Sequence, residues 1–272
     1  MKSIEIENAK HLVGGLRLHS DLKQSHPGLP LVTIITATFN AADHLLRTIK
    51  SICDLTYDNI EWIILDGASS DNTVDLIRQN EAVIDYWVSE PDNGIYDAWN
   101  KGVSLARGEW IAFLGAGDVY KPYAINVYMS AIESLLVIPE FASSRVRLVN
   151  SSWKELRIWG APFNWTIFKK YMTVAHVGAL HHKSLFEKHG LFDTAYSSAA
   201  DYEFLMRCGP SLKTIYLSDV TVDMQVGGIS NGNKGMFETY AVQKKFGAGI
   251  AAKFRLWLAL GKSVIRPWLR GY

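Results

Sequence analysis

The stretch Glu109–Pro122 reads EWIAFLGAGDVYKP and joins a buried strand to a polar turn. Its apolar run, Trp110–Leu114, is long enough for a strand that is covered on both faces. Two glycines around Ala116 then let the backbone approach a bulky anionic ligand, and Asp118 follows them. An acid at the carboxyl end of a strand can give an oxygen ligand to Mg2+ or Mn2+, so we expect Asp118 to hold a metal ion. The alternative is that Asp118 caps the turn, because Asp and Gly are common turn residues.

Upstream of this stretch, strand-like runs alternate with amphipathic ones. Runs of β-branched and apolar residues predict strands, and apolar residues at helical spacing predict the helices between them. The first predicted strand begins at Leu31 (LVTIITATFN), and the next three cover Ile60–Leu65, Ile84–Ser89 and Trp110–Leu114. This alternation is typical of an α/β fold, in which helices cover both faces of a mostly parallel sheet. The ligands of such sheets gather at the carboxyl ends of the strands.

Composition and charge argue against several other classes of protein. The chain has 272 residues, 48% of them hydrophobic, so it can bury a substantial core in one large domain or two small ones. Its formal net charge of +1 gives no overall attraction to nucleic acid. Cys53 and Cys208 lack metal-ligand spacing, and we interpret them as reduced core thiols. The first residues lack the apolar core of a signal peptide and no run of about 18 apolar residues occurs, so we expect a cytoplasmic location without a membrane-spanning helix.

Four segments at the ends of the predicted strands are expected to converge on one ligand site. They are Thr36–Asn40, Asp66–Asp71, Asp92–Asn100 and Gly115–Asp118. Asp66 comes directly after a buried strand, where its carboxylate is expected to accept the ring N–H of a uracil. The alternative for Asp66 is the role of a turn or helix-capping residue, which we favour for Asp71.

Six segments of the chain resemble family 2 glycosyltransferases of the GT-A fold, a Rossmann-like α/β fold. They are TIITATFN, ILDGASSDNT, EPDNGIYDAWNKGVSLARGEW, FLGAGD, AADYEFLMR and GGIS, and the match covers about Leu31–Ser230. Each segment is weak alone, but six in the right order are specific for the family. The resemblance is to enzymes of bacterial exopolysaccharide, O-antigen and colanic-acid assembly. It implies a nucleotide-sugar donor site in the amino-terminal half, Mg2+ or Mn2+ on the diphosphate, an acceptor site in the carboxyl-terminal half, and inversion at the anomeric carbon.

The resemblance assigns donor and metal binding to the amino-terminal half. The residues that it implies for the nucleotide sugar are Thr36, Thr38, Asn40, Asp66, Asn93, Asp97, Asn100 and Lys101. The family's D-x-D motif appears here as Gly115-Ala116-Gly117, and only the following acid, Asp118, is retained. Because Mg2+ usually keeps several waters and uses few protein ligands, one carboxylate with donor phosphates suits it, and metal dependence is expected to be loose.

In the carboxyl-terminal half, the resemblance assigns the general base to Asp201. An inverting displacement needs a carboxylate that takes the proton of the acceptor hydroxyl. The alternative is that Asp201 only stabilises the first turn of a helix. Glu203 and Arg207 are expected to orient this helix or to touch the acceptor.

His176 is expected near the acceptor and the diphosphate, again by resemblance. It lies on a β-like stretch, Thr173–His182, in which His176 and His182 would point to one face. The preceding stretch, Ile158–Tyr171, is dense in aromatic residues. Core packing explains about half of them, and one or two are expected to line the acceptor site, because sugars stack on aromatic rings.

The chain divides into three parts. Residues 1–30 are an N-terminal extension, residues 31–235 form the GT-A domain with a donor half (31–120) and an acceptor half (121–235), and residues 236–272 form a basic helical tail. After Glu238 the tail has no acid, and its apolar residues and most of its cations fall on different sides of a helix. This pattern favours an amphipathic helix on an anionic membrane surface, and a helix docked on the domain is the alternative.

These features predict an inverting glycosyltransferase of cell-surface polysaccharide biosynthesis. Its donor is expected to be a UDP-linked sugar, and its acceptor a hydroxyl of a saccharide or lipid-linked saccharide at the inner face of the cytoplasmic membrane. A catalytically silent scaffold of a polysaccharide assembly complex is the alternative from another class, because the D-x-D acids are missing. A sugar-nucleotide nucleotidyltransferase shares the alternating fold, but TATFNAADH lacks the Gly-rich, Arg- and Lys-bearing phosphate loop of that class.

Overall fold

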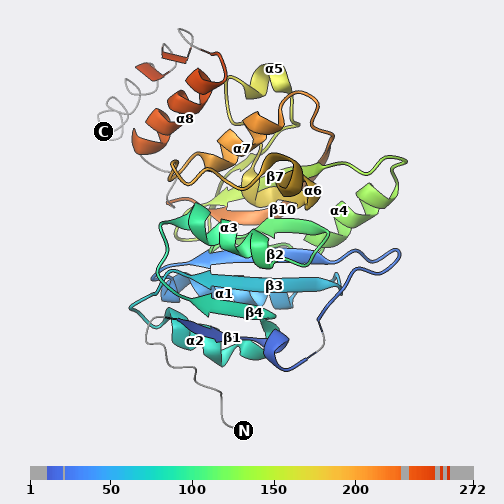
Figure 1. Cartoon of the computed structure of the whole chain (residues 1–272), viewed down its shortest axis with the longest axis vertical. Helices are drawn as coiled ribbons and strands as arrows, with labels where there is room; N and C mark the ends of the chain where they lie inside the picture. Colours follow the sequence, from blue (N-terminus) through green and yellow to red (C-terminus); the bar gives the residue numbers. More distant parts are fainter. Residues whose placement is uncertain (1–10, 21, 228–232, 249–251, 254–255, 258–272) are drawn as a thin grey trace.

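A mixed sheet runs through the molecule and is covered by helices on both faces (Figure 1). The computed structural model describes residues 11–20, 22–227, 233–248, 252–253 and 256–257. Within these residues the sheet has ten strands in the order β1-β4-β3-β2-β5-β9-β7-β10-β6, with β8 paired to β7 off this path. The predicted α/β class is confirmed, and the sheet extends well beyond the four strands of the predicted strand–helix alternation.

The four predicted strands form one parallel block of the sheet. They are β2 (Val32–Thr38), β3 (Ile60–Asp66), β4 (Tyr86–Ser89) and β5 (Trp110–Phe113). β2 pairs in parallel with β3 and β5, and β3 pairs in parallel with β4. Because almost all of their residues are buried, these strands are continuous apolar runs rather than alternating ones.

Four helices pack on the two faces of this part of the sheet, and the first three of them connect its parallel strands. They are α1 (Ala42–Cys53), α2 (Thr73–Gln79), α3 (Ile95–Leu105) and α4 (Ala124–Glu133). Successive strand residues point to opposite faces, so Ile34 packs in the core that contains α1 and α4, whereas Ile35 packs in the core that contains α3. Both cysteines are free as predicted, but Cys53 ends α1 as an exposed residue and is therefore not a core thiol, unlike Cys208.

The acceptor half completes the sheet with antiparallel and long-range pairs. Its strands are β6 (Val119–Tyr120), β7 (Phe141–Val149), β8 (Glu155–Trp159), β9 (Ala179–His182) and β10 (Thr214–Gln225). β9 lies between β5 and β7 and runs antiparallel to both. The continuous strand expected at Thr173–His182 is wrong, because His176–Gly178 form a 3-10 turn before β9. Gly178 lies so close to β7 that a Cβ there would be 2.7 Å from Val146 Cγ1.

The described part of the N-terminal extension belongs to the same sheet. β1 (Leu12–Gly14) pairs antiparallel with β4 at the edge of the sheet. Arg17 then forms an ion pair with Glu61, a β3 residue that is 1% exposed and also accepts hydrogen bonds from Thr33 Oγ1 and the Arg107 backbone N–H. A buried carboxylate needs such partners, so this extension contributes to the fold.

Three helices and the start of the predicted tail cover the acceptor half. They are α5 (Trp165–Phe168), α6 (Ser184–His189), α7 (Ala200–Cys208) and α8 (Asn233–Lys245). α8 is docked on the domain: Val242 is fully buried, Lys245 forms an ion pair with Glu203 of α7, and Gln243 Nε2 donates to the Lys170 carbonyl at 2.9 Å. The predicted boundary at residue 235 therefore falls inside a packed helix, and most of the predicted membrane-binding tail lies outside the described residues. None of the helices in the described ranges has the length and apolarity needed to cross a bilayer.

Candidate active site

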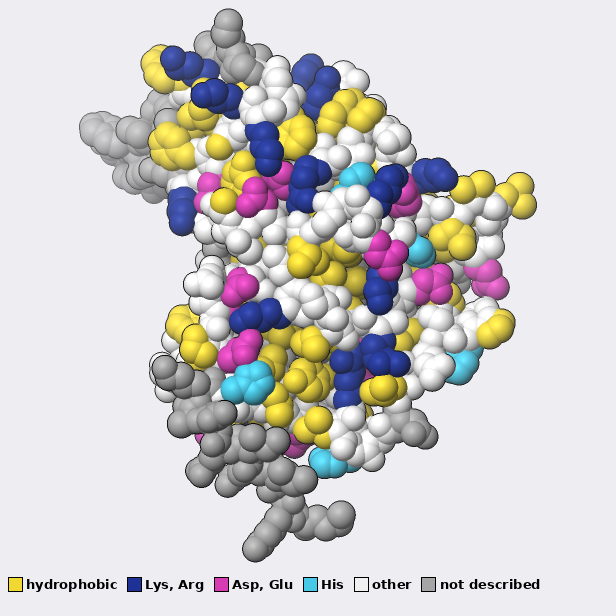
Figure 2. Space-filling model, viewed as in Figure 1, with side chains coloured by type: hydrophobic (Ala, Val, Ile, Leu, Met, Phe, Trp, Pro, Cys, Tyr) yellow, Lys and Arg dark blue, Asp and Glu magenta, His cyan; other side chains and the backbone are white. Residues whose placement is uncertain are grey.

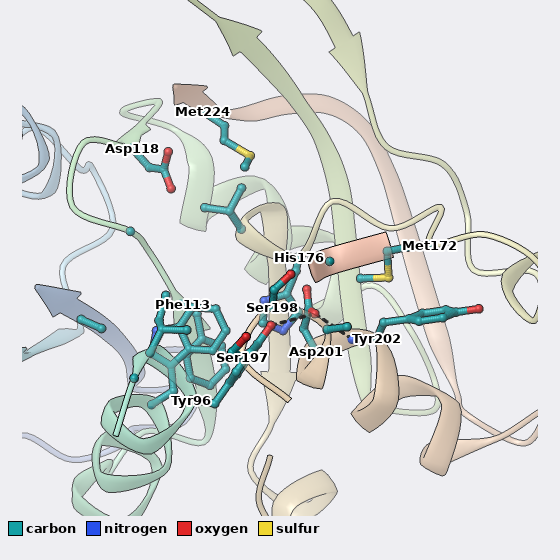
Figure 3. Close-up of a pocket in the computed structure, with 18 of the residues that line it drawn as sticks. Tyr96, Phe113, Asp118, Met172, His176, Ser197, Ser198, Asp201, Tyr202 and Met224 are labelled. Carbon is teal, nitrogen blue, oxygen red and sulfur yellow. Dashed lines mark hydrogen bonds between the residues drawn. The ribbon is translucent and has the colours of Figure 1, made fainter. Parts of the chain in front are cut away.

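A cleft of about 1300 Å³ opens where β2, β3, β4 and β5 end. All four segments that the sequence predicts to converge contribute to its lining, with Thr38, Gly67, Asp92 and Asp118 among the residues. The opposite wall comes from the acceptor half, including His176 of the 3-10 turn, Asp201 of α7 and several residues of α8. Figure 3 shows Asp118 and Asp201 entering the cleft from these two sides. The predicted convergence of the four segments at the carboxyl ends of the strands is seen in the structure, and ligand binding in this cleft stays a prediction.

Asp66 is 2% exposed and is not among the residues that line the cleft. Its Oδ1 accepts hydrogen bonds from Thr38 Oγ1 (3.0 Å) and Ser69 Oγ (2.5 Å), and its Oδ2 accepts from the Ser69 backbone N–H (2.9 Å) and Ser89 Oγ (2.6 Å). A carboxylate has about four lone-pair positions, and these four donors occupy them. Asp66 thus links the ends of β2, β3 and β4. Both of its carboxylate oxygens are occupied, so neither can accept the ring N–H of a uracil.

Two of the three predicted residues on β2 and its following loop line the cleft. Thr38 and Asn40 are in its wall, whereas Thr36 is fully buried and accepts a hydrogen bond from Trp62 Nε1 at 3.0 Å. Asn40 has a φ of 47°, in the left-handed region that Asn tolerates better than most residues. Its Oδ1 accepts from the Ser70 backbone N–H, so the asparagine fixes this loop against the end of β3.

The four predicted residues around α3 bond to the protein itself and lie outside the cleft lining. They are Asn93, Asp97, Asn100 and Lys101. Asn100 bonds both backbone groups of Phe192, and the Asn93 backbone N–H donates to Asp97. Lys101 Nζ lies 2.8 Å from Glu90 Oε1 and 3.7 Å from Asp97 Oδ2. These contacts give the group a role in holding the α3 region in place beside the donor side of the cleft.

Three residues on the donor side line the cleft without having been singled out from the sequence. They are Phe39, His44 and Asp92. Phe39 is 66% exposed, which is unusual for a phenylalanine directly after a buried strand. Burial raises the pKa of Asp92, whose Oδ1 accepts the Gly94 backbone N–H at 2.8 Å. Phe39 and Asp92 lie in two of the segments that the sequence predicts to converge. The sequence alone does not indicate that these side chains, rather than that of Asp66, line the cleft.

Asp118 lies in the turn between β5 and β6 and lines the cleft. Its Oδ1 accepts a long hydrogen bond, 3.3 Å, from the Gln225 backbone N–H, and no described cation pairs with it. Burial therefore raises the pKa of Asp118 to about 7. A Cβ on residue 115 would lie 2.8 Å from Asp118 Oδ2, so the glycine at the first D-x-D position leaves room for this carboxylate.

The neighbourhood of Asp118 fits a cation held by few protein ligands. Among the described residues, no cluster of three or more His, Cys, Asp and Glu side chains could hold a metal ion by itself. A poorly partnered carboxylate with a raised pKa is nevertheless stabilised by a cation. Mg2+ accepts such a site when donor phosphates and waters supply the other ligands.

Asp201 occupies the first turn of α7 at the other side of the cleft (Figure 3). Tyr96 Oη donates to Asp201 Oδ1 at 3.0 Å, and the Tyr202 backbone N–H donates to the same oxygen at 2.8 Å. Among the described residues no donor bonds Oδ2, which leaves this oxygen open to the cleft. Burial raises the pKa of Asp201, and the hydrogen bonds from Tyr202, from Tyr96 and from its own backbone N–H oppose that rise. The arrangement suits a base that is held by one oxygen and can accept a proton on the other.

His176 lies in the cleft wall within an aromatic cluster, stacked on Trp99 and Phe113. It is 7% exposed, and burial lowers its pKa to about 3. Its Nε2 has no hydrogen-bond partner among the described residues. The imidazole is thus neutral near pH 7, and it cannot serve there as a cationic contact to a diphosphate.

Glu203 and Arg207 lie outside the cleft lining and connect the acceptor-side helices. Glu203 is fully buried and pairs with Arg207 (2.7 Å) and Lys245 (2.9 Å). Arg207 also donates to the His189 and Leu191 carbonyls. These contacts agree with the expectation that Glu203 and Arg207 orient α7. Neither side chain is placed to contact an acceptor in the cleft.

Comparison with known families gives the class of protein to which this fold and cleft belong, the glycosyltransferases. The profile of "Glycosyl transferase family 2" matches residues 33–190, and the chain belongs to this family. An uncharacterized glycosyltransferase of Mycobacterium tuberculosis is 32% identical over 212 residues, covering 74% of this chain and 78% of the relative. A "PGL/p-HBAD biosynthesis glycosyltransferase" of Mycobacterium bovis is 28% identical over 249 residues, covering 88% of this chain and 91% of the relative. The protein is therefore a family 2 glycosyltransferase.

Solved structures show the same fold at low sequence identity. S. aureus TarS 1-349 in complex with UDP-GlcNAc superposes with a TM-score of 0.62 at 15% identity, over 78% of this chain and 66% of that one. The mannosyltransferase PcManGT from Pyrobaculum calidifontis, in complex with GDP-Man and Mn2+, gives a TM-score of 0.60 at 18% identity, over 87% of this chain and 72% of that one. This chain thus spans just under two thirds of the TarS fragment.

Proposed function

We propose that this enzyme transfers a sugar from a UDP-linked donor to a hydroxyl of a saccharide or lipid-linked saccharide, with inversion at the anomeric carbon. The observation that carries the proposal is the placement of Asp201. One of its oxygens is fixed by two hydrogen bonds, and the other is open to the cleft across from Asp118. An inverting displacement requires such a base on the acceptor side and a diphosphate site on the donor side.

In the proposed reaction the acceptor hydroxyl oxygen attacks the anomeric carbon while the bond to the nucleotide diphosphate breaks. Asp201 Oδ2 takes the proton of the hydroxyl, and the leaving diphosphate carries away the bonding electrons. Asp118 would hold a divalent cation, Mg2+ or Mn2+, which when bound offsets the negative charge of the diphosphate. Thr38 and Asn40, with Phe39 and Asp92, line the side of the cleft where the nucleotide would lie.

A role in cell-surface glycan synthesis is supported by the printed names of the relatives, which include a "PGL/p-HBAD biosynthesis glycosyltransferase" and a "Putative teichuronic acid biosynthesis glycosyltransferase" of Bacillus subtilis. Complexes of the structural neighbours with UDP-GlcNAc and with GDP-Man and Mn2+ support a nucleotide-sugar donor and a divalent cation. A peripheral position at the inner face of the cytoplasmic membrane would bring the enzyme to a lipid-linked acceptor.

A screen of nucleotide sugars by thermal shift tests the donor. Ligand at 100 times its Kd should stabilise the folded state by about 2.7 kcal/mol, and UDP-sugars should give the largest shift. Equal shifts with all nucleotides, or none, would contradict the donor assignment.

The scaffold alternative is favoured by one observation, the Gly115-Ala116-Gly117 sequence at the D-x-D position. A scaffold that retains the cleft would bind a nucleotide sugar without turning it over. Donor hydrolysis measured with and without Mn2+ separates the scaffold from the enzyme. Only an enzyme releases UDP faster than the uncatalysed reaction in buffer.

A further inference from the structure

The end of α5 presents an exposed face with two large side chains and a lysine. Backbone hydrogen bonds continue the helical turn to Tyr171, so Ile167, Lys170 and Tyr171 lie three and four residues apart on one side. Ile167 is 49% and Tyr171 56% exposed, and Lys170 is exposed as well. Lys170 and Tyr171 also line the cleft, so this face forms part of its mouth.

α8 presents a similar face to solvent beside it. Lys234, Phe237, Ala241 and Lys244 are separated by three, four and three residues, which places them on one stripe of the helix, and all four are exposed. The other sides of α8 are occupied: Gly235, Met236, Thr239, Tyr240 and Gln243 line the cleft, and Val242 is buried. The outward stripe thus lacks a packing partner among the described residues.

The two faces lie at the same end of the molecule. The bond from Gln243 to the Lys170 carbonyl joins α8 to the end of α5. Beyond α8, Ala252 is buried, whereas Lys253 is exposed and Trp257 is 74% exposed. We call this set the rim surface: Ile167, Lys170, Tyr171, Lys234, Phe237, Lys244, Lys253 and Trp257. Figure 1 places α5 and α8 at one end of the molecule, and Figure 2, in the same view, shows hydrophobic side chains interleaved with lysines and arginines at that end.

The charged side chains of the rim surface itself are all lysines. Residues 156–186 and 239–272 contain no Asp or Glu. Glu238 of α8 comes directly before the second range. It accepts hydrogen bonds from the backbone N–H groups of Ser197 and Ser198, so its carboxylate faces the domain. A docking contact between two proteins usually depletes lysine, whereas an anionic lipid surface attracts it.

We propose that the rim surface binds the face of a bilayer that contains anionic lipid. The lysines lie at the headgroups, and Ile167, Tyr171, Phe237 and Trp257 enter the boundary between headgroups and acyl chains. The surface extends the lipid contact expected for the tail to α5 and to the packed helix α8. The function of this membrane contact rests on the proposed lipid-linked acceptor. Binding through the rim surface brings the mouth of the cleft to the membrane in which such an acceptor resides.

Vesicle binding by the full-length chain tests the proposal without any need for turnover. Phosphatidylcholine vesicles with about 30% phosphatidylglycerol should bind the protein at low salt, and each lysine near the surface should contribute about fivefold to the affinity. The double variant Lys234→Gln/Lys244→Gln should therefore bind about 25-fold more weakly. The matched control Lys50→Gln/Lys154→Gln removes two exposed lysines elsewhere and should bind as the wild type does.

Insertion gives a second readout. Brominated lipid should quench tryptophan fluorescence in the wild type more than in Trp257→Phe. Equal loss of binding in both lysine pairs, binding to pure phosphatidylcholine with the same affinity, or no difference in quenching would overturn the proposal. So would a dimer that Lys234→Gln/Lys244→Gln dissociates, because the surface would then join two copies of the chain. Donor hydrolysis in solution should be the same in both double variants, and its absence in every protein would count against the proposed function and not against the surface.

Discussion

The hydrogen bond from Tyr96 to Asp201 joins the donor half to the acceptor half, and Tyr96→Phe removes it while keeping the ring. Tyr96 is buried beside Trp99 and Phe192, and its Oη lies 3.0 Å from Asp201 Oδ1. Burial raises the pKa of Tyr96, so this hydroxyl stays protonated and donates. A hydrogen bond to a charged group contributes about 1.5–3 kcal/mol. The substitution should therefore disfavour the ionised form of Asp201 by at least about tenfold.

The sign of the effect follows from the role of Asp201 as a base. Burial already raises the pKa of Asp201, and the bond from Tyr96 opposes the rise. Without that bond the pKa rises further, so the acid limb of the rate profile moves to higher pH. The rate should fall about tenfold on this limb and recover as pH increases. The Tyr202 N–H remains on Oδ1, so the loss should be smaller than that caused by removing the base.

The assay is kcat against pH for donor transfer or hydrolysis, with donor affinity measured separately by calorimetry. Tyr123→Phe is the matched control, because Tyr123 Oη donates to the Val220 carbonyl at 3.1 Å outside the cleft. A profile of Tyr96→Phe that coincides with the wild type would refute the reasoning. A loss of equal size at every pH would also refute it, because it would show that Tyr96 acts without changing the ionisation of Asp201.

Two further variants test the metal site and the packing behind the cleft. Asp118→Asn should stabilise the metal-free protein by about 4 kcal/mol at pH 8 and by about 1.5 kcal/mol at pH 5, since a carboxyl whose pKa is raised to about 7 costs stability as pH rises from its unfolded to its folded pKa. Denaturant titrations at both pH values check this, and Mn2+ should raise the Tm of the wild type alone. Glu203→Gln leaves Arg207 and Lys245 without the buried carboxylate and should lower the free energy of unfolding by about 2–3 kcal/mol, whereas Lys50→Gln at an exposed pair should leave it nearly unchanged.

The parallel half of the fold could be predicted because its signals are local. β2, β3, β4 and β5 are buried runs that end in polar loops, and each can be recognised from a few residues. The acceptor half depends on contacts that no local pattern encodes. β9 pairs between β5 and β7, and the short turn at His176 brings Gly178 so close to Val146 of β7 that a Cβ would not fit.

The site shows the same limit at the level of single side chains. Asp66 and Asp92 both lie at or after the ends of strands. Hydrogen bonds from Thr38, Ser69 and Ser89 occupy the carboxylate of Asp66, whereas Asp92 lines the cleft. Asp118 and Asp201 could be singled out by resemblance, and both line the cleft. Tyr96 could not, because its partner lies 105 residues away.

The most direct test of the central claim compares the wild type with Asp201→Asn on the same UDP-sugar. Asparagine keeps the size of the side chain and an oxygen for the Tyr96 and Tyr202 donors, but it accepts no proton. The account predicts that turnover falls by about 100-fold or more while donor affinity, measured by calorimetry, stays within about twofold. An unchanged rate in Asp201→Asn would contradict the account and remove Asp201 from the mechanism.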